Sequence, residues 1–281
     1  MAAPRSPKQI VSLLSPERLI LALGPHGAAA AIAGGATGRG PQARHFAADP
    51  ADAGSPALAA RGLARRALGA FKGRAKRVSV ILSSHFVRQM LVPWSSELSG
   101  DNEEAAAVRH HFRRIHGDAA RGWTLRYSVS AGGATCIGCA IEPQLLEAMR
   151  EESTAHGFKL ASVQPSLAAN FNRWRELFGT HAGLFLLVEE DRYACAQFRD
   201  GGWSALNCGR LGPDLGLEGL VARQLGLAAA EPSALGIWLR MPGAARQEDF
   251  DVEGATVRIL RPDATQLEAA LEDAAFAGPA T

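Results

Sequence analysis

The chain has 281 residues, of which 47% are hydrophobic and 21% are charged, and its formal net charge is +2. This hydrophobic content is ordinary for a globular protein and excludes wholesale disorder. Thirty basic residues against 28 acidic ones give no reason to expect a nucleic-acid partner, because such binding needs a concentrated basic surface.

The sequence predicts neither a membrane span nor an export signal. No stretch reaches the roughly 18 uncharged apolar residues that a membrane-spanning helix needs. Near the N-terminus, Glu17 and Arg18 interrupt the apolar residues, and no export-type cleavage sequence follows. We therefore expect a cytoplasmic protein.

Short apolar runs alternate with helical patterns in the first 180 residues. Strands are predicted over 19–23, 28–35, 78–82, 86–92, 123–129, 135–141 and 158–163. Helices are predicted over 58–71, 103–116, 143–157 and 165–177. In the second helix the expected apolar stripe is Ala107, Val108, Phe112 and Ile115, and in the last it is Leu167, Phe171, Trp174 and Leu177. Gly157 is expected to end the third helix in a left-handed conformation. The segment 34–56, rich in Gly, Ala, Pro and Asp, is expected to be a loop or a weak edge element.

A second group of elements begins near residue 183. Three strands are predicted over 184–189, 193–199 and 203–208, joined by short turns. They are followed by a helical stretch over 215–225, strands over 235–241 and 255–260, and a helix over 264–276. The alternation of strands and helices, with one meander of hairpins, predicts an α/β fold with mixed sheets.

The four cysteines do not have the spacing of a metal site. Cys136 and Cys139 lie in one predicted strand, which directs them to opposite faces, and Cys195 and Cys208 are separated by 12 residues. We expect buried structural cysteines and no bound metal.

Three local sequences carry a resemblance to a known family: RVSVILSSHFVRQMLVPW, WTLRYSV and TCIGCAIEPQLLEAMREESTAHGFKLASVQPSLAANFNRW. Together with the meander after Gly183, they resemble the actin-like assembly proteins of bacterial type IV pili and type II secretion, namely the PilM group and the cytoplasmic domain of the GspL group. The resemblance implies an actin-like (ribonuclease H-like) two-lobed fold with mixed sheets. It places the first lobe at 1–180, with an inserted subdomain at about 95–140, and a reduced second lobe at 181–281.

The resemblance also implies two hairpin turns that would hold the phosphates and Mg²⁺ of a nucleotide. Their counterparts are Gly24, Pro25, His26 and Gly27 in the first turn, and Glu189, Glu190 and Asp191 in the second. The first lacks the acidic residue, and Pro25 lacks a backbone donor. The second places three carboxylates where a triphosphate would be repelled. We therefore expect a degenerate nucleotide site, with no catalytic residue and no cofactor.

The function implied by the resemblance is that of a non-enzymatic cytoplasmic scaffold, peripheral to the inner membrane through its partners. Such a protein would bind the short cytoplasmic N-terminal segment of a membrane protein in an apolar groove within 78–172, rimmed by arginines. The alternative is a divergent ATPase or switch of the same machinery that binds ATP and Mg²⁺.

A basic helix offers further partner-binding candidates: Arg109, Arg113 and Arg114, which could contact an acidic partner or form a solvated face. The sequence Ser83-Ser84-His85 lacks the G-x-S-x-G pattern of a hydrolase nucleophile, so no hydrolase is expected.

Overall fold

A computed structural model of the chain describes residues 17–276 apart from 35–42, 50–54, 95–99, 130–134, 180–181, 200–201, 213, 229–234, 245–247 and 264–265. The chain forms two compact units, each assembled from separate parts of the sequence. Unit 1 comprises Met1–Ser83, Glu147–Gln164 and Pro262–Thr281, and unit 2 comprises Ser84–Leu146 and Pro165–Arg261.

Unit 1 is built on a five-stranded mixed sheet in the order β3-β2-β1-β4-β8. The strands are β1 (Arg18–Leu23), β2 (Gly27–Ala33), β3 (Arg44–Ala47), β4 (Arg77–Leu82) and β8 (Lys159–Pro165). β1 runs antiparallel to β2 and parallel to β4. Its residues from Leu19 to Leu23 are buried, as expected for an apolar strand covered on both faces.

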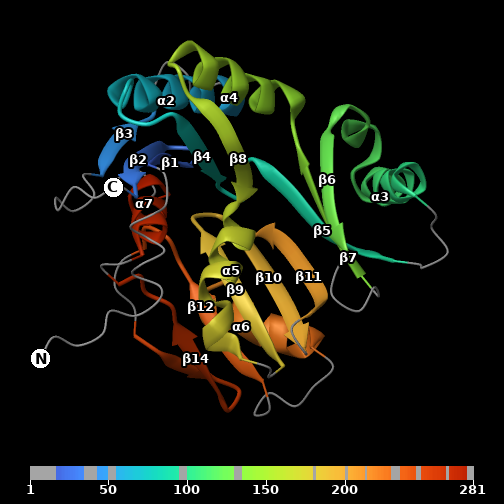
Figure 1. Ribbon diagram of the computed structural model, residues 1–281. Helices are drawn as coiled ribbons and strands as arrows, with labels where there is room; N and C mark the ends of the chain where they lie inside the picture. Colours follow the sequence, from blue (N-terminus) through green and yellow to red (C-terminus); the bar gives the residue numbers. More distant parts are fainter. Residues whose placement is uncertain are drawn as a thin grey trace, which may run out of the picture. The chain divides into compact units, whose positions relative to one another are not determined.

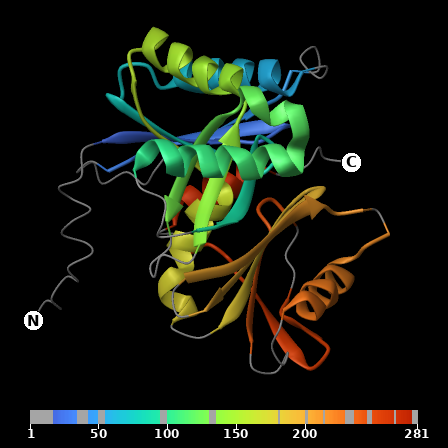
Figure 2. The ribbon, with the colours of Figure 1, turned by 90° about the vertical axis from the view of Figure 1, so that its right-hand side faces the viewer.

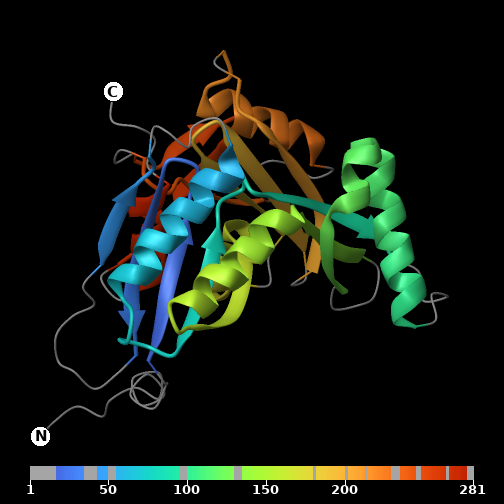
Figure 3. The same ribbon diagram turned by 90° about the horizontal axis from the view of Figure 1, so that it is seen from above.

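Helices cover both faces of this sheet. Figures 1 and 3 show α2 (Pro56–Ala70) beside α4 (Pro143–Ala155) on one face, and Figure 1 shows α7 (Leu267–Ala275) on the other. The Ser55 side chain accepts a hydrogen bond from Leu58 N at the start of α2, where Pro56 occupies the first turn. Gly157 has a φ of 80° just after α4, so the predicted left-handed end of this helix is confirmed.

Unit 2 contains two sheets. The larger has the order β11-β10-β9-β12-β14-β13, and the smaller has the order β5-β7-β6. The larger sheet consists of β9 (Gly183–Glu189), β10 (Arg192–Arg199), β11 (Gly202–Arg210), β12 (Gly236–Arg240), β13 (Phe250–Val252) and β14 (Ala255–Ile259). The smaller consists of β5 (Val87–Pro93), β6 (Thr124–Val129) and β7 (Thr135–Ile141), with α3 (Asp101–His116) and the 3₁₀ helix η2 (Gly117–Gly122) beside it.

The two faces of the larger sheet have different cores. Figure 2 shows α5 (Ser166–Phe178) on one side and α6 (Leu217–Leu227) on the other. On the α5 face, Phe171 and Phe178 join an aromatic cluster with Phe185, Phe198, Trp203 and Trp238. On the α6 face, Leu220, Val221 and Leu225 pack with aliphatic residues of the strands. The sheet therefore separates an aromatic layer from a mainly aliphatic one.

Some predicted details differ from the structure. Ile115 and Leu177 are 61% and 56% exposed, so their assignment to apolar stripes is wrong. Phe178, which follows Leu177, is buried instead, because the aromatic cluster lies on its side of the helix. The short strand β13 was not predicted, and part of 34–56 forms the edge strand β3.

The bounds of the compact units differ from those of the predicted lobes, which meet at residue 180. The C-terminal helix α7 packs on β1 and β2 and so belongs to unit 1. The small sheet of unit 2 begins with β5, before the expected insertion at about 95–140. The assignment of actin-like lobes to 1–180 and 181–281 stays a prediction. Along the described ranges, no helix combines the length and apolar character that crossing a bilayer requires.

Candidate functional site

The β1–β2 turn of unit 1 contains the first predicted nucleotide hairpin, Gly24–Gly27. Its Gly24 N–H donates to the Gly27 carbonyl at 2.8 Å, and the His26 carbonyl accepts from Ala48 N at 2.8 Å. A Cβ added to Gly24 would lie 2.6 Å from the carbonyl oxygen of Ala275, at the end of α7. The turn is therefore held by one hydrogen bond of its own and one from the residue after β3, and it is packed tightly against a helix of the same unit.

The β9–β10 turn of unit 2 contains the second predicted hairpin, and its first carboxylate is buried. Glu189 is 1% exposed and accepts a hydrogen bond of 2.5 Å from Ser84 N. It also accepts one from the hydroxyl of Ser166, the first residue of α5. Glu190, which follows, is exposed and has a φ of 53°, a left-handed conformation at the tip of the hairpin. Glu189 thus holds two distant segments of unit 2 at the hairpin.

Asp191, on the other side of the same turn, contacts three basic side chains. Its Oδ1 lies 2.8 Å from His85 Nε2 and 3.8 Å from Arg192 Nε, and its Oδ2 lies 3.6 Å from Arg210 Nε. Burial alone would raise the pKa of Asp191, but the hydrogen bond with His85 and the charges of His85, Arg192 and Arg210 lower it overall. The sequence alone does not distinguish the three carboxylates of this turn. In the structure, Glu189 and Asp191 each form hydrogen bonds or ion pairs with other residues of unit 2.

A cavity of about 460 Å³ lies in unit 2 between the small sheet and α5. We call it the α5 cavity, and the residues that line it are Gln89, Arg126, Tyr127, Ser128, Ile137, Cys139, Pro165, Ala168, Phe171, Asn172, Arg175, Gly202 and Trp203. Most of them fall within the predicted groove region, 78–172. Arg126 and Arg175, two of the lining residues, are exposed.

The two faces of β7 explain why the small sheet can form one wall of this cavity. Cys136, Gly138 and Ala140 face inward and are buried, and a Cβ on Gly138 would lie 2.7 Å from the ring of Phe112 in α3. Ile137 and Cys139 alternate with them and line the cavity on the opposite face. One face of the sheet is therefore covered by α3, and the other is left to line the α5 cavity.

The opposite wall comes from α5 and β11. Phe171 packs edge to face on Trp203 at a centroid distance of 5.0 Å, and Arg175 follows Phe171 by one helical turn. Arg175 and Trp203 lie outside the predicted region 78–172. For Arg175 the local signal is its i, i+4 spacing from Phe171 on α5, but a helical pattern alone does not show which strand the helix faces, so it does not point to Trp203.

The other candidate residues lie apart from the cavity. Arg109, Arg113 and Arg114 are exposed on α3, and none of them lines it, so their role in partner binding stays a prediction.

Burial raises the pKa of the Cys136 thiol to about 11 and that of Cys195 to about 12, as expected for packed cysteines. Cys208 is exposed and Cys139 is only partly buried, so the prediction of buried cysteines is wrong for these two. Within the part of the chain that the structure describes, no three His, Cys, Asp or Glu residues form a group that could hold a metal ion.

Comparisons with known proteins identify the fold. No protein-family model matches the sequence, and no curated protein matches it significantly. The cytoplasmic domain of EpsL, an inner-membrane component of the type II secretion system of Vibrio cholerae, is similar in structure with a TM-score of 0.60 and 13% identity, over 91% of this chain and 94% of that one. A chain of the PilM–PilN type IV pilus biogenesis complex is similar with a TM-score of 0.56 and 13% identity, over 93% and 96%.

A Bacteroides thetaiotaomicron protein of unknown function with an actin-like ATPase fold gives a TM-score of 0.58 at 12% identity, over 82% of each chain. At such low identities the similarity concerns the fold. The chain has an actin-like α/β fold with mixed sheets, and the predicted fold class is confirmed.

Proposed function

We propose that this actin-like protein is a non-enzymatic scaffold of a bacterial pilus or secretion assembly platform. It would bind the short cytoplasmic segment of an inner-membrane protein in the α5 cavity, and it would need no nucleotide. Structural neighbours from the same two kinds of machinery, EpsL and the PilM–PilN complex, support the cellular setting.

The observation that carries the proposal is the α5 cavity itself. It places the uncovered face of β7 opposite the aromatic pair Phe171 and Trp203, with exposed arginines at its border. Apolar surface with a few polar groups at the edge is typical of a groove that binds a peptide through its alternate side chains. By contrast, residues of the two hairpins that would hold a nucleotide form hydrogen bonds and ion pairs with other residues of their own units.

The decisive experiment compares affinity capture by the wild-type chain and by a variant whose cavity is filled. Ala168 lines the cavity from α5 and is only partly buried, so Ala168→Trp would occupy it without entering the core. Ala105→Trp, on an exposed position of α3, is the matched control. Each tagged protein would be recovered from the cell envelope of its own organism, and the retained proteins quantified by mass spectrometry.

We expect the wild type and Ala105→Trp to retain the same inner-membrane protein, and Ala168→Trp to retain at least about tenfold less of it, as expected when a peptide loses its pocket. If no membrane protein is retained by the wild type, the scaffold role is wrong. If both variants retain it equally, the α5 cavity is not its binding site.

A further inference from the structure

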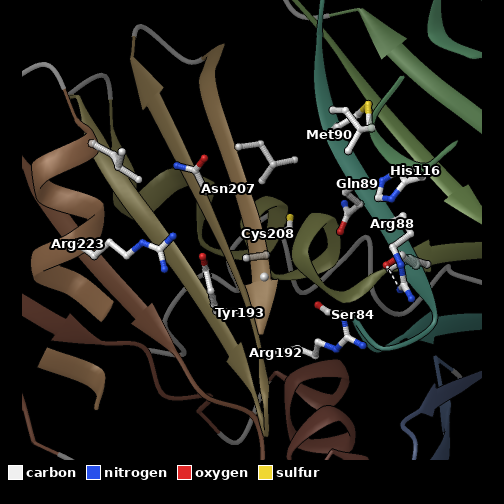
Figure 4. Close-up of a pocket in the computed structure, with 16 residues that line it drawn as sticks. Ser84, Arg88, Gln89, Met90, His116, Arg192, Tyr193, Asn207, Cys208 and Arg223 are labelled. Atoms are coloured by element: carbon white, nitrogen blue, oxygen red, sulfur yellow. Dashed lines mark hydrogen bonds between the residues drawn. The ribbon is translucent and has the colours of Figure 1, made fainter. Parts of the chain in front are cut away.

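A second cavity of unit 2 lies on another part of the smaller sheet. It has a volume of about 460 Å³ and is bordered by β5, by β10 and β11, and by residues of α3 and α6 (Figure 4). Gln89 is the one described residue that lines both cavities. We call this second cavity the arginine cavity. Arg88, Arg192 and Arg223 line it, and no aspartate or glutamate is among its described lining residues.

The positive charge in this cavity is only partly balanced by its surroundings. In Figure 4, Arg88 and Arg192 lie on one side near Ser84, and Arg223 lies on the other side near Tyr193. Arg192 Nε is buried without a hydrogen-bond acceptor, and the carboxylate of Asp191, at 3.8 Å, also contacts His85 and Arg210. Burial lowers the pKa of Arg192 most, and the nearby charges of Arg88 and Arg210 lower it further.

Arg88 is held in place by neutral groups. Its Nη1 donates to the carbonyl oxygens of His85 and Val87, at 3.3 and 3.1 Å, so the side chain is oriented while its charge is not cancelled by these bonds. Burial and the charge of Arg88 also lower the pKa of His116 on the same wall. An anionic group in this cavity would therefore find oriented positive charges.

Apolar side chains lie among these charges. Ile115, on α3, and Leu227, on α6, are 61% and 60% exposed, and both line the cavity. β5 and β11, which line it as well, are the terminal strands of their sheets. Edge strands can pair with an extended polypeptide, whose alternate side chains then meet the two walls.

The backbone around the cavity does not provide a phosphate site. Phosphate sites use converging N–H groups at glycine-rich turns or helix N-termini. Here the Ser84 N–H donates to Glu189, and α3 and α6 contribute Ile115, His116 and Leu227 from their C-terminal ends. The negative ends of the two helices disfavour any anion beside them. Carboxylates spaced along a chain can each lie at a separate guanidinium group, so they suit the cavity better than a compact multivalent anion does.

We propose that the arginine cavity binds an acidic, partly apolar segment of a protein partner. Carboxylate side chains of the segment would contact Arg88, Arg192 and Arg223, and an apolar side chain would pack against Ile115 or Leu227. The site is separate from the α5 cavity, and its existence does not depend on the scaffold role proposed above.

The test uses a capped six-residue peptide in which leucine alternates with aspartate or glutamate, labelled with an uncharged dye. A second peptide carries asparagine and glutamine in place of the acids. Fluorescence anisotropy at low salt measures the binding of both to the full chain, with Arg223→Gln as the cavity variant. Arg258→Gln, on an exposed position of β14, removes the same charge from a distant strand and is the matched control.

We expect the acidic peptide to bind at least about tenfold more tightly than its amide counterpart, and Arg223→Gln to weaken it by about fivefold or more, as expected for a charge-assisted hydrogen bond. Arg258→Gln should leave the affinity unchanged, and Ile115→Asp, which adds a negative charge at the border, should weaken it. Filling the α5 cavity with Ala168→Trp should leave the affinity for the acidic peptide unchanged.

Equal binding of the two peptides, or equal effects of the two arginine variants, would overturn the proposal. Displacement of the acidic peptide by millimolar inorganic phosphate would also overturn it, in favour of a small-anion site. If the membrane partner is captured but the acidic peptide does not bind, this inference fails while the scaffold role stands.

Discussion

Glu152 lies on the buried side of α4, and two arginines of α2 reach its carboxylate. Arg61 Nε and Arg65 Nη2 lie 2.8 and 3.0 Å from Glu152 Oε1, and the glutamate is 4% exposed. The hydrogen bond from Arg65 is the largest influence on its pKa, which is lowered overall although burial opposes this. A buried charge must be paired in this way to offset its desolvation, so these ion pairs link α4 to α2.

We predict that Glu152→Gln lowers the free energy of unfolding by about 1–2 kcal/mol at pH 7, because a charge-assisted pair becomes a neutral one and the arginines are partly exposed. The pKa of Glu152 is lower in the folded state than in the unfolded state, so its contribution is present above the unfolded value and is lost as the pH falls through the folded value. Urea unfolding at pH 7 and pH 3.5 should show the difference between wild type and variant narrowing at the lower pH.

The matched control is Glu147→Gln, which alters an exposed pair with Arg150 on the same helix. It should change the unfolding free energy by less than about 0.5 kcal/mol at either pH. A difference for Glu152→Gln that stays constant or grows as the pH falls would contradict the assigned role of the carboxylate.

At the scale of elements, α7 completes unit 1 from the far end of the sequence. Its residues Ala269, Leu271 and Ala275 are buried, and it packs on β1 and β2. At Gly24 the packing is tight, because a Cβ added there would lie 2.6 Å from the Ala275 carbonyl oxygen, so only a glycine fits. The conformation of the β1–β2 turn and the position of α7 are therefore coupled.

We predict that Gly24→Ala destabilises the protein by about 1–3 kcal/mol, since the added methyl group would push α7 away from the turn. The change is expected as a lower midpoint in thermal or urea unfolding. Gly122→Ala, where a Cβ would meet no heavy atom within 4 Å, is the control and should leave the midpoint nearly unchanged. Equal midpoints for Gly24→Ala and the control would show that the end of α7 is not firmly packed.

Local patterns predicted most elements, but not which residues of different elements meet. The apolar run at Val78–Leu82 and the meander after Gly183 gave the right strands because their hydrophobic patterns are strong. Ile115 and Leu177 were misplaced because helical periodicity defines a face only to within one neighbouring residue. The partners of Glu189 and Asp191 lie 23 to 106 residues away at Ser84, His85 and Ser166, a pairing for which the sequence has no local signal.

For the whole molecule, the scaffold role and the alternative ATP-binding switch differ in whether Mg-ATP raises the Tm. With Mg-ATP we expect no change in Tm, because Pro25 offers no N–H in the first turn and the Glu189 and Asp191 carboxylates of the second are already held by protein groups. A ligand at 100 times its dissociation constant would stabilise the folded state by about 2.7 kcal/mol. A rise in Tm of several degrees with Mg-ATP, absent with magnesium alone, would therefore favour the switch.

The discontinuous composition of the units has a consequence for biosynthesis. Unit 2 is complete once Arg261 has been translated, whereas unit 1 still lacks the helix that covers one face of its sheet. On the ribosome, β1 and β2 come first in the sequence, and the helix that packs on them is translated last. We expect the growing polypeptide to need chaperones during that interval, because exposed apolar strands are prone to aggregate.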